Sequence, residues 1–187
     1  TRKKKRKWQE LLEKWSVPGL EYWYALPPIV LLNYLQVKSL SEGYNGPVMD
    51  EWMYQNALRA NKKTCGLLTP ESHYGMLNKI PVSKQLKMLN KFFRNPAQAR
   101  RKARRMLQLY RNSEMHGLYR YASSQLGQYR GLLLIDRNMR MVDKMKFMMR
   151  SDPCIFVIGA AHLSGERGIL HLLKKEPGMK LRAHPSI

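Results

Sequence analysis

The stretch that decides the predicted fold lies near the carboxyl end of the chain, at residues 154–162, where the sequence is CIFVIGAAH. Its first five residues are all apolar, which is typical of a β-strand buried on both faces. Gly159 then allows the backbone to turn sharply. A helix from Gly165 to about Lys175 and a strand over residues 179–183 complete a strand–turn–helix–strand unit, which predicts a right-handed crossover between parallel strands.

Upstream of this unit the apolar residues recur mostly with helical spacing. Within residues 8–15, two tryptophans and two leucines stand at positions i, i+3, i+4 and i+7 and predict one apolar stripe. One further strand is predicted at residues 63–68, a short apolar stretch between turn signals. The fold class that follows is α/β: helix-rich, with a small, mostly parallel sheet and helices packed on it. Helices are expected over residues 8–15, 27–40, 50–60, 83–93, 95–110, 118–128 and 136–150, with a further one starting at Thr69–Pro70.

The composition limits the class of protein. The chain has 187 residues, of which 44% are hydrophobic, so it can form a packed core and is not disordered as a whole. Lys and Arg number 34 against 13 Asp and Glu, which gives a formal net charge of +21 and a pI of about 10.2. Such a charge excludes an ordinary near-neutral metabolic enzyme and attracts polyanions, either nucleic acid or an anionic membrane surface. The two cysteines are too few for a disulfide scaffold and fit a reducing compartment.

Two basic segments are candidates for contact with nucleic acid. The first is an arm at residues 1–7, separate from a single domain over residues 8–187; without a partner the arm would be flexible and solvated. The second is the outer face of the helix predicted at 95–110, since no acidic residue lies between Arg94 and Arg111. Like charges without acids at i±4 repel one another, which favours a face that meets a polyanion over a merely solvated one. The candidate residues are Arg2, Lys3, Lys4, Lys5, Arg6, Lys7, Arg100, Arg101, Lys102, Arg104, Arg105 and Arg111.

One histidine follows the predicted strand at the place where open α/β sheets hold their ligands. Gly159 and His162 form a Gly-x-x-His turn at the carboxyl end of the strand, so the imidazole would point into the crevice there. Chemically it could serve as a metal ligand or a general base. A lone histidine in a turn is more often structural, and the chain has no HExxH, paired CxxC, Walker or GxGxxG motif that would support catalysis.

A longer segment around this histidine resembles a known protein family. Residues 156–173, FVIGAAHLSGERGILHLL, are similar to the closing segment of the TraB/PrgY/GumN family, also called TIKI-like, which ends on a strand, a GxxHLxGexGll turn and a helix. Residues 136–139, DRNM, resemble the Arg-Asn helix start of that family, and residues 63–67 resemble its central strand. The resemblance extends over about residues 8 to 183.

The resemblance also implies a kind of site. Enzymes of the family are described as metal-dependent peptidases whose site uses two GxxH motifs and a glutamate. His162 matches the second motif only, and Leu68 stands where the family usually has the glutamate of Leu-Glu-Thr. The resemblance therefore implies a catalytically degenerate domain with no catalytic residue and no cofactor, and a divalent metal (Mn, Co or Zn) only if the domain is an enzyme. The vestigial catalytic candidates are His162, Arg137 and Glu166, the metal candidate is His162, and the turn residues are Gly159 and Gly165.

Charge and resemblance together favour a basic structural subunit that contacts RNA within a large ribonucleoprotein such as a mitochondrial ribosome. Its partners would be RNA and neighbouring protein subunits, and its location the mitochondrial matrix or else another reducing intracellular compartment. The alternative is the carboxyl-terminal part of a metal-dependent peptidase of the TraB/TIKI type, whose first GxxH motif would lie upstream of Thr1 or on another chain. A membrane surface is disfavoured, because the apolar helix faces are needed for the core. Missing sheet strands would expose an edge, which a strand from a partner could cover.

Overall fold

The computed structural model describes residues 2–40, 46 and 48–184, with side chains from Lys5 onward except at residues 39 and 40. Within that part, 68% of the chain is helical and no β-strand is present. The predicted α/β class, with its small parallel sheet, is therefore wrong, and the described chain is all-helical.

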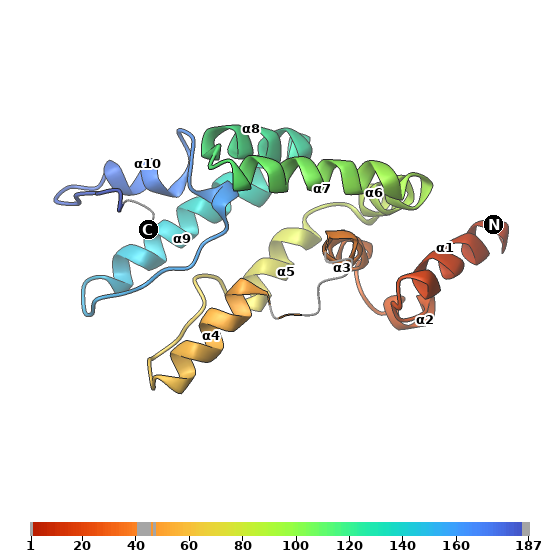
Figure 1. Cartoon of the computed structure of the whole chain (residues 1–187), viewed down its shortest axis with the longest axis horizontal. Coiled ribbons are helices and arrows are strands. Elements are labelled where there is room, and N and C mark those ends of the chain that lie inside the picture. The colour runs from red at the N-terminus through yellow and green to blue at the C-terminus, as the bar shows by residue number, and fades with distance from the viewer. Residues whose placement is uncertain (1, 41–45, 47, 185–187) are drawn as a thin grey trace. The chain divides into compact units, whose positions relative to one another are not determined.

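The chain divides into two compact units. One contains Thr1–Asn45 with Tyr74–Arg105, and the other contains Gly46–His73 with Met106–Ile187. Two helices, α5 and α7, contribute residues to both units. The helices, labelled in Figure 1, are α1 (Arg2–Lys14), α2 (Leu20–Trp23), α3 (Pro28–Leu40), α4 (Met49–Arg59), α5 (Pro70–Asn78), α6 (Val82–Arg94), α7 (Pro96–Arg111), α8 (Met115–Leu126), α9 (Asp136–Met148) and α10 (Ile169–Lys174); shorter helical turns are η1 (Gly127–Tyr129), η2 (Gly131–Ile135) and η3 (Ala160–His162).

The helices predicted from apolar spacing are present, with ends that differ by a few residues. Two of their starts have side-chain caps: the backbone N–H of Ser72 donates to Oγ1 of Thr69 (3.2 Å), and that of Gln98 donates to Oδ1 of Asn95 (3.0 Å). The last helix, α10, begins at Ile169 rather than at Gly165. No helix in the described part of the chain is both long enough and apolar enough to span a bilayer.

The first unit is held together by an aromatic and aliphatic core. The predicted stripe of α1 faces inward: Leu12 is fully buried, and Trp8 stacks on Phe93 of α6 with ring centroids 4.3 Å apart. Trp15 meets the ring of Phe92 edge-on at 5.7 Å. Aromatic pairs in such geometries contribute about 1 kcal/mol beyond the burial of their area. The apolar spacing of residues 8–15 thus becomes the contact between α1 and α6.

A single buried glutamine joins the helices of this core. Gln85 of α6 is only 1% exposed, and its Oε1 accepts the backbone N–H of Ile29 at the start of α3 (3.1 Å). Its Nε2 donates to the carbonyl of Ile80 at 2.8 Å and approaches that of Leu77 at 3.5 Å. The side chain therefore satisfies backbone groups that neither their own helices nor water can reach.

Replacement of this glutamine by leucine should destabilise the first unit. In Gln85→Leu the N–H of Ile29 and the carbonyl of Ile80 lose their partners, and each unsatisfied buried group costs about 1–3 kcal/mol. We expect a loss of roughly 3 kcal/mol in the free energy of unfolding. Urea denaturation followed by tryptophan fluorescence measures it, since three of the four tryptophans lie in this unit.

The matched control is Lys84→Leu, an exposed position one residue earlier on the same helix. It introduces the same side chain without touching the buried hydrogen bonds, so its urea midpoint should stay close to that of the wild type. Equal midpoints for the two variants would show that the amide contributes nothing.

The second unit has its own core between α9 and α10. Met141, Val142 and Met145 of α9 pack against Ile169 and Leu173 of α10. The helix predicted over residues 136–150 is therefore present, and Met141 and Met145 fill this core, whereas Met139 and Met149 are exposed. This core carries the turn that contains His162.

The three segments predicted as strands form no regular secondary structure in the described part of the chain. No backbone hydrogen bond joins residues 153–158 to any described residue. Ile155 is 90% and Val157 is 41% exposed, whereas Phe156 and Ile158 pack against the core of α9 and α10. The unbroken apolar run predicted a strand buried on both faces, but helices cover only one of its sides. A strand also requires a ladder of hydrogen bonds to a neighbour, which residues 63–68 and 179–183 lack as well.

Candidate functional site

His162 lies at the end of η3, where segment 153–159 meets the second core. Its ring is half-buried, and Nδ1 lies 2.6 Å from Oδ1 of Asn138 on α9. An amide oxygen can only accept a hydrogen bond, so Nδ1 carries the hydrogen and donates. In the neutral ring the other nitrogen, Nε2, is then left with a free lone pair.

Burial and a neighbouring cation keep this histidine neutral. Desolvation, together with the positive charge of Arg137, lowers the pKa of His162 from 6.5 to about 4. At neutral pH the imidazole is therefore uncharged.

Two of the three vestigial catalytic candidates come together in the second unit. Arg137 precedes Asn138 on α9 and is half-buried, and its charge reaches both His162 and His73 of α5. Glu166 is exposed on the turn that follows η3 and forms no ion pair with a described residue. The group that assembles is thus two histidines and an arginine, without the carboxylate that the resemblance implied.

The two predicted turn glycines differ in what the backbone requires of them. Gly165 has a φ of +89°, and a Cβ there would lie 2.3 Å from the ring of Tyr119, so only glycine fits. Gly159 has a φ of −57° and ordinary space around it, so its conformation is open to other residues.

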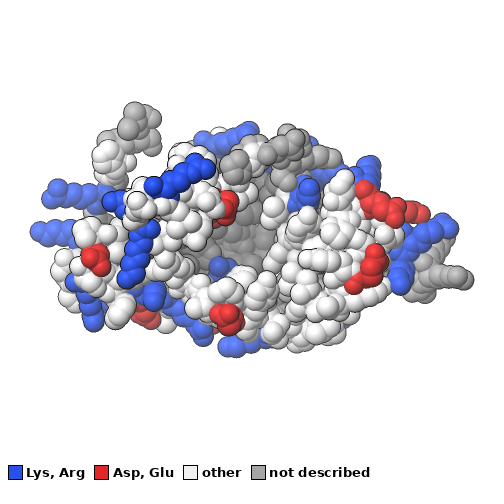
Figure 2. All heavy atoms as spheres, turned by 90° about the horizontal axis from the view of Figure 1, so that it is seen from below, with Lys and Arg blue, Asp and Glu red and all other residues white. Residues whose placement is uncertain are grey.

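The basic arm is part of a helix. The backbone of Arg2, Lys3 and Lys4 belongs to α1, but their side chains lie outside the described part of the chain. Lys5, Arg6 and Lys7 are exposed; Nζ of Lys5 lies 5.3 Å from the ring centre of Tyr24, and Arg6 pairs with Glu10 one turn later at 3.3 Å. Figure 2 shows Lys and Arg side chains distributed over the face that it draws, with fewer Asp and Glu among them.

The second basic segment is α7, and its cations do not all point outward. Arg101, Arg104, Arg105 and Arg111 are exposed as predicted, and Lys102 is half-buried. Arg100 differs from the prediction, because its guanidinium lies over the ring of Trp15 at 5.7 Å, inside the first unit. It acts as a cation–π contact of the core.

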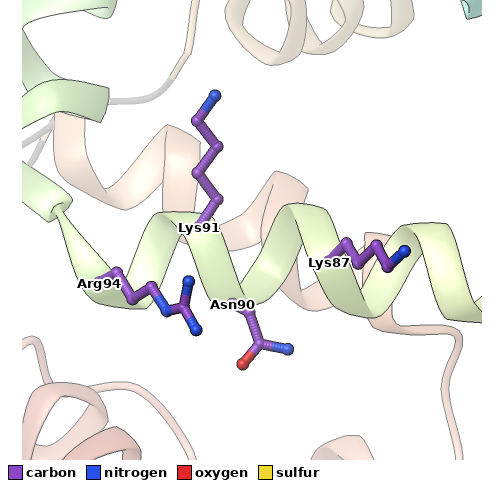
Figure 3. Close-up of a pocket in the computed structure, with 4 residues that line it drawn as sticks. All are labelled: Lys87, Asn90, Lys91 and Arg94. Carbon is purple, nitrogen blue, oxygen red and sulfur yellow. The ribbon is translucent and has the colours of Figure 1, made fainter.

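A third basic surface, on α6, was missed from the sequence. Lys87, Asn90, Lys91 and Arg94 line a cleft of about 560 Å³ along this helix. Figure 3 shows the side chains of Asn90 and Arg94 on the same side of α6. The signal was available: no acidic residue occurs between Glu71 and Glu114, and the cations of α6 recur at helical spacing.

Asn90 adds a neutral acceptor to this cleft. Its Nδ2 donates to the carbonyl of Leu86 at 2.7 Å. Its Oδ1 is buried and has no hydrogen-bond partner in the described part of the chain. The cleft therefore offers three cations at its surface, whereas this acceptor is buried beneath them.

Comparison with known proteins decides the family. The model of the TraB/PrgY/gumN family matches residues 1–180. The chain belongs to this family. Searches of the curated proteins and of the solved structures gave no match. Membership confirms the resemblance drawn from residues 156–173 and 136–139.

The TraB/PrgY/gumN resemblance had raised the question of a metal at His162, and the residues around it do not fit one. Within the described part of the chain no group of three or more His, Cys, Asp or Glu side chains could hold a metal ion. The ring of His162 is hydrogen-bonded to the amide of Asn138 and feels the positive charge of Arg137, and a cation repels a divalent metal. Leu68, at the position of the expected glutamate, is part of the apolar core of α9 and α10.

The low pKa of His162 makes the stability of this TraB/PrgY/gumN chain dependent on pH. The unfolded state binds the proton with the ordinary pKa of 6.5 and the folded state only near 4, so stability is fully present above pH 6.5. It should fall as the pH drops from 6.5 toward 4, by about 2 kcal/mol after allowance for partial exposure. His162→Gln cannot titrate and should flatten this fall, as measured by urea midpoints at pH 7 and pH 4.5.

His116→Gln is the control, since His116 is exposed on α8. This variant should keep the wild-type dependence on pH. If His162→Gln retained the same dependence as well, the acid sensitivity would come from other groups.

Proposed function

We propose that this TraB/PrgY/gumN-family chain is a catalytically degenerate, basic structural subunit that contacts RNA in a large ribonucleoprotein such as a mitochondrial ribosome. The observation that carries the proposal is the stretch between Glu71 and Glu114, which holds eleven Lys and Arg and no acid. Most of these cations lie on α6 and α7, and their exposed members include Lys87, Lys91 and Arg94.

The charge pattern favours phosphate as the partner. Unpaired, exposed cations on a helix repel one another and cost stability, and a phosphate backbone removes that repulsion. Each Lys or Arg that neutralises a phosphate releases counterions, so the contact is strongest at low salt and weakens as the salt concentration rises. Because Lys and Arg outnumber acids by 34 to 13 over the chain, attraction to a polyanion also acts at long range.

Neighbouring protein subunits form the second part of the proposal. The backbone N–H and C=O groups of segment 153–158 have no partners among the described residues, and Ile155 and Val157 face solvent. A strand from an adjacent subunit could pair with it, as edge strands do in peptide recognition. In the proposed setting, the assembly lies in the mitochondrial matrix.

Neutralisation of the α6 cations should weaken RNA binding and reduce its dependence on salt. For the triple variant Lys87→Gln, Lys91→Gln, Arg94→Gln we expect roughly tenfold weaker binding of a structured RNA hairpin, with the slope of log affinity against log salt lower by about 2. Fluorescence anisotropy of the labelled RNA at rising KCl measures both quantities. Arg101→Gln with Arg104→Gln on α7 should give a smaller change in the same direction.

A charge-matched control distinguishes RNA binding by the α6 surface from RNA binding that depends only on the net charge of the chain. Lys174, Lys175 and Lys180 are exposed in and after α10, and their replacement by Gln removes the same number of cations. Their loss should change the slope much less than loss of the α6 cations. Equal effects of the two triples would sink the proposal, because binding would then follow total charge and no particular face.

A further inference from the structure

Arg137 is half-buried, and its guanidinium has no hydrogen-bond or ion-pair partner among the described residues. Its Nε is buried and has no hydrogen-bond partner, and the side chain forms no hydrogen bond and no ion pair with any described residue. Burial lowers the pKa of Arg137 from its ordinary value, which shows that the surroundings disfavour the charged form. Buried polar groups are almost always satisfied, and a buried cation without a counter-charge is destabilising.

The surroundings of this guanidinium contain cations and neutral rings. Its charge lowers the pKa of His162 on η3 and of His73 on α5, and no carboxylate shifts any of the three groups. Arg140 lies one turn further along α9 and donates to Oγ of Ser72 at 3.3 Å. All these residues belong to the second unit, so the cluster exists within one compact body.

The position of Arg137 is fixed by its neighbour in the chain. Asn138 is 0% exposed, and its Nδ2 donates to the carbonyl of Arg167 at 2.7 Å and approaches that of His162 at 3.4 Å. Its Oδ1 accepts from the ring of His162. Since both ends of this amide are bonded, the backbone that bears Arg137 cannot shift freely to bring the guanidinium into water.

We propose that Arg137 is the anchor of a ligand site between α9, α5 and η3, and that the ligand is a small monocarboxylate. A carboxylate presents two oxygens that match two N–H groups of the guanidinium fork. The charges also balance: one half-buried cation neutralises one negative charge, and His162 is neutral. A phosphate dianion would leave one charge uncompensated in the same desolvated place.

This site is independent of the RNA-contacting surface. It shares no residue with the cleft on α6 or with the exposed cations of α7. Either proposal can therefore fail without the other. RNA binding should be unchanged in Arg137→Met, and the α6 triple variant should still bind the carboxylate.

The direct test is NMR of the arginine side chains in the full chain. The Nε–Hε signal of Arg137, assigned from its loss in Arg137→Lys, should move saturably as acetate or N-acetylalanine is added, with a dissociation constant in the millimolar range. The acetate arm reports a bare carboxylate and the N-acetylalanine arm one at the end of a peptide chain. Inorganic phosphate at equal ionic strength should bind more weakly, and the exposed Arg140 should not saturate. Tighter binding of phosphate, or the same response at Arg140, would overturn the proposal.

A second measurement uses stability and needs no ligand. Removal of an unpartnered buried charge should raise the urea midpoint in Arg137→Met, whereas Arg150→Met, at an exposed position, should leave it unchanged. Added acetate should raise the midpoint of the wild type and not that of Arg137→Met. A lower midpoint for Arg137→Met without acetate would mean that Arg137 has a structural partner, and the proposal would then be wrong. If this variant does not fold, the NMR titration of the wild type decides alone.

Discussion

The side-chain amide of Asn138 is the constraint on which the second unit depends. It is the contact through which the start of α9 holds the turn after η3, by hydrogen bonds to two carbonyl groups and one imidazole. Those bonds set the tautomer of His162 and the place of Arg137 together. Loss of the amide would release the turn and the histidine at once, because no other described side chain bonds to both the imidazole of His162 and the carbonyl of Arg167. The site is therefore a product of one buried polar residue rather than of a sheet edge.

The helices could be predicted from sequence because their signals are local. Apolar spacing in residues 8–15 and capping by Thr69 and Asn95 act within a few residues, and each appears in the structure. The strands could not be predicted, because a strand depends on a partner elsewhere in the chain. The apolar run at residues 154–158 predicts a segment that is buried on both sides, but in the structure helices cover only one side. Family membership was also visible in sequence, since residues 156–173 carry it without reference to the fold.

The candidate site was predicted only in part, for a similar reason. His162 stands out by its motif, whereas the isolation of Arg137 depends on which side chains are absent from its surroundings. A sequence shows which residues are present, but it does not show which side chains lack a hydrogen-bond or ion-pair partner in the folded chain. Arg100 illustrates the same limit, because it belongs to a basic run and yet lies on Trp15. The basic surface of α6 could have been predicted from the sequence, since the stretch without acidic residues, between Glu71 and Glu114, includes α6 as well as α7.

The segment 153–158 and the net charge of the chain have opposite effects on the association of two copies in solution. Free backbone groups beside exposed Ile155 and Val157 can pair with the same segment of another copy. A net charge of +21 holds copies apart, but only over the Debye length, which shrinks to about 3 Å at 1 M salt. Raising the salt concentration therefore shortens the range of the repulsion between copies while leaving the exposed apolar side chains of this segment unchanged.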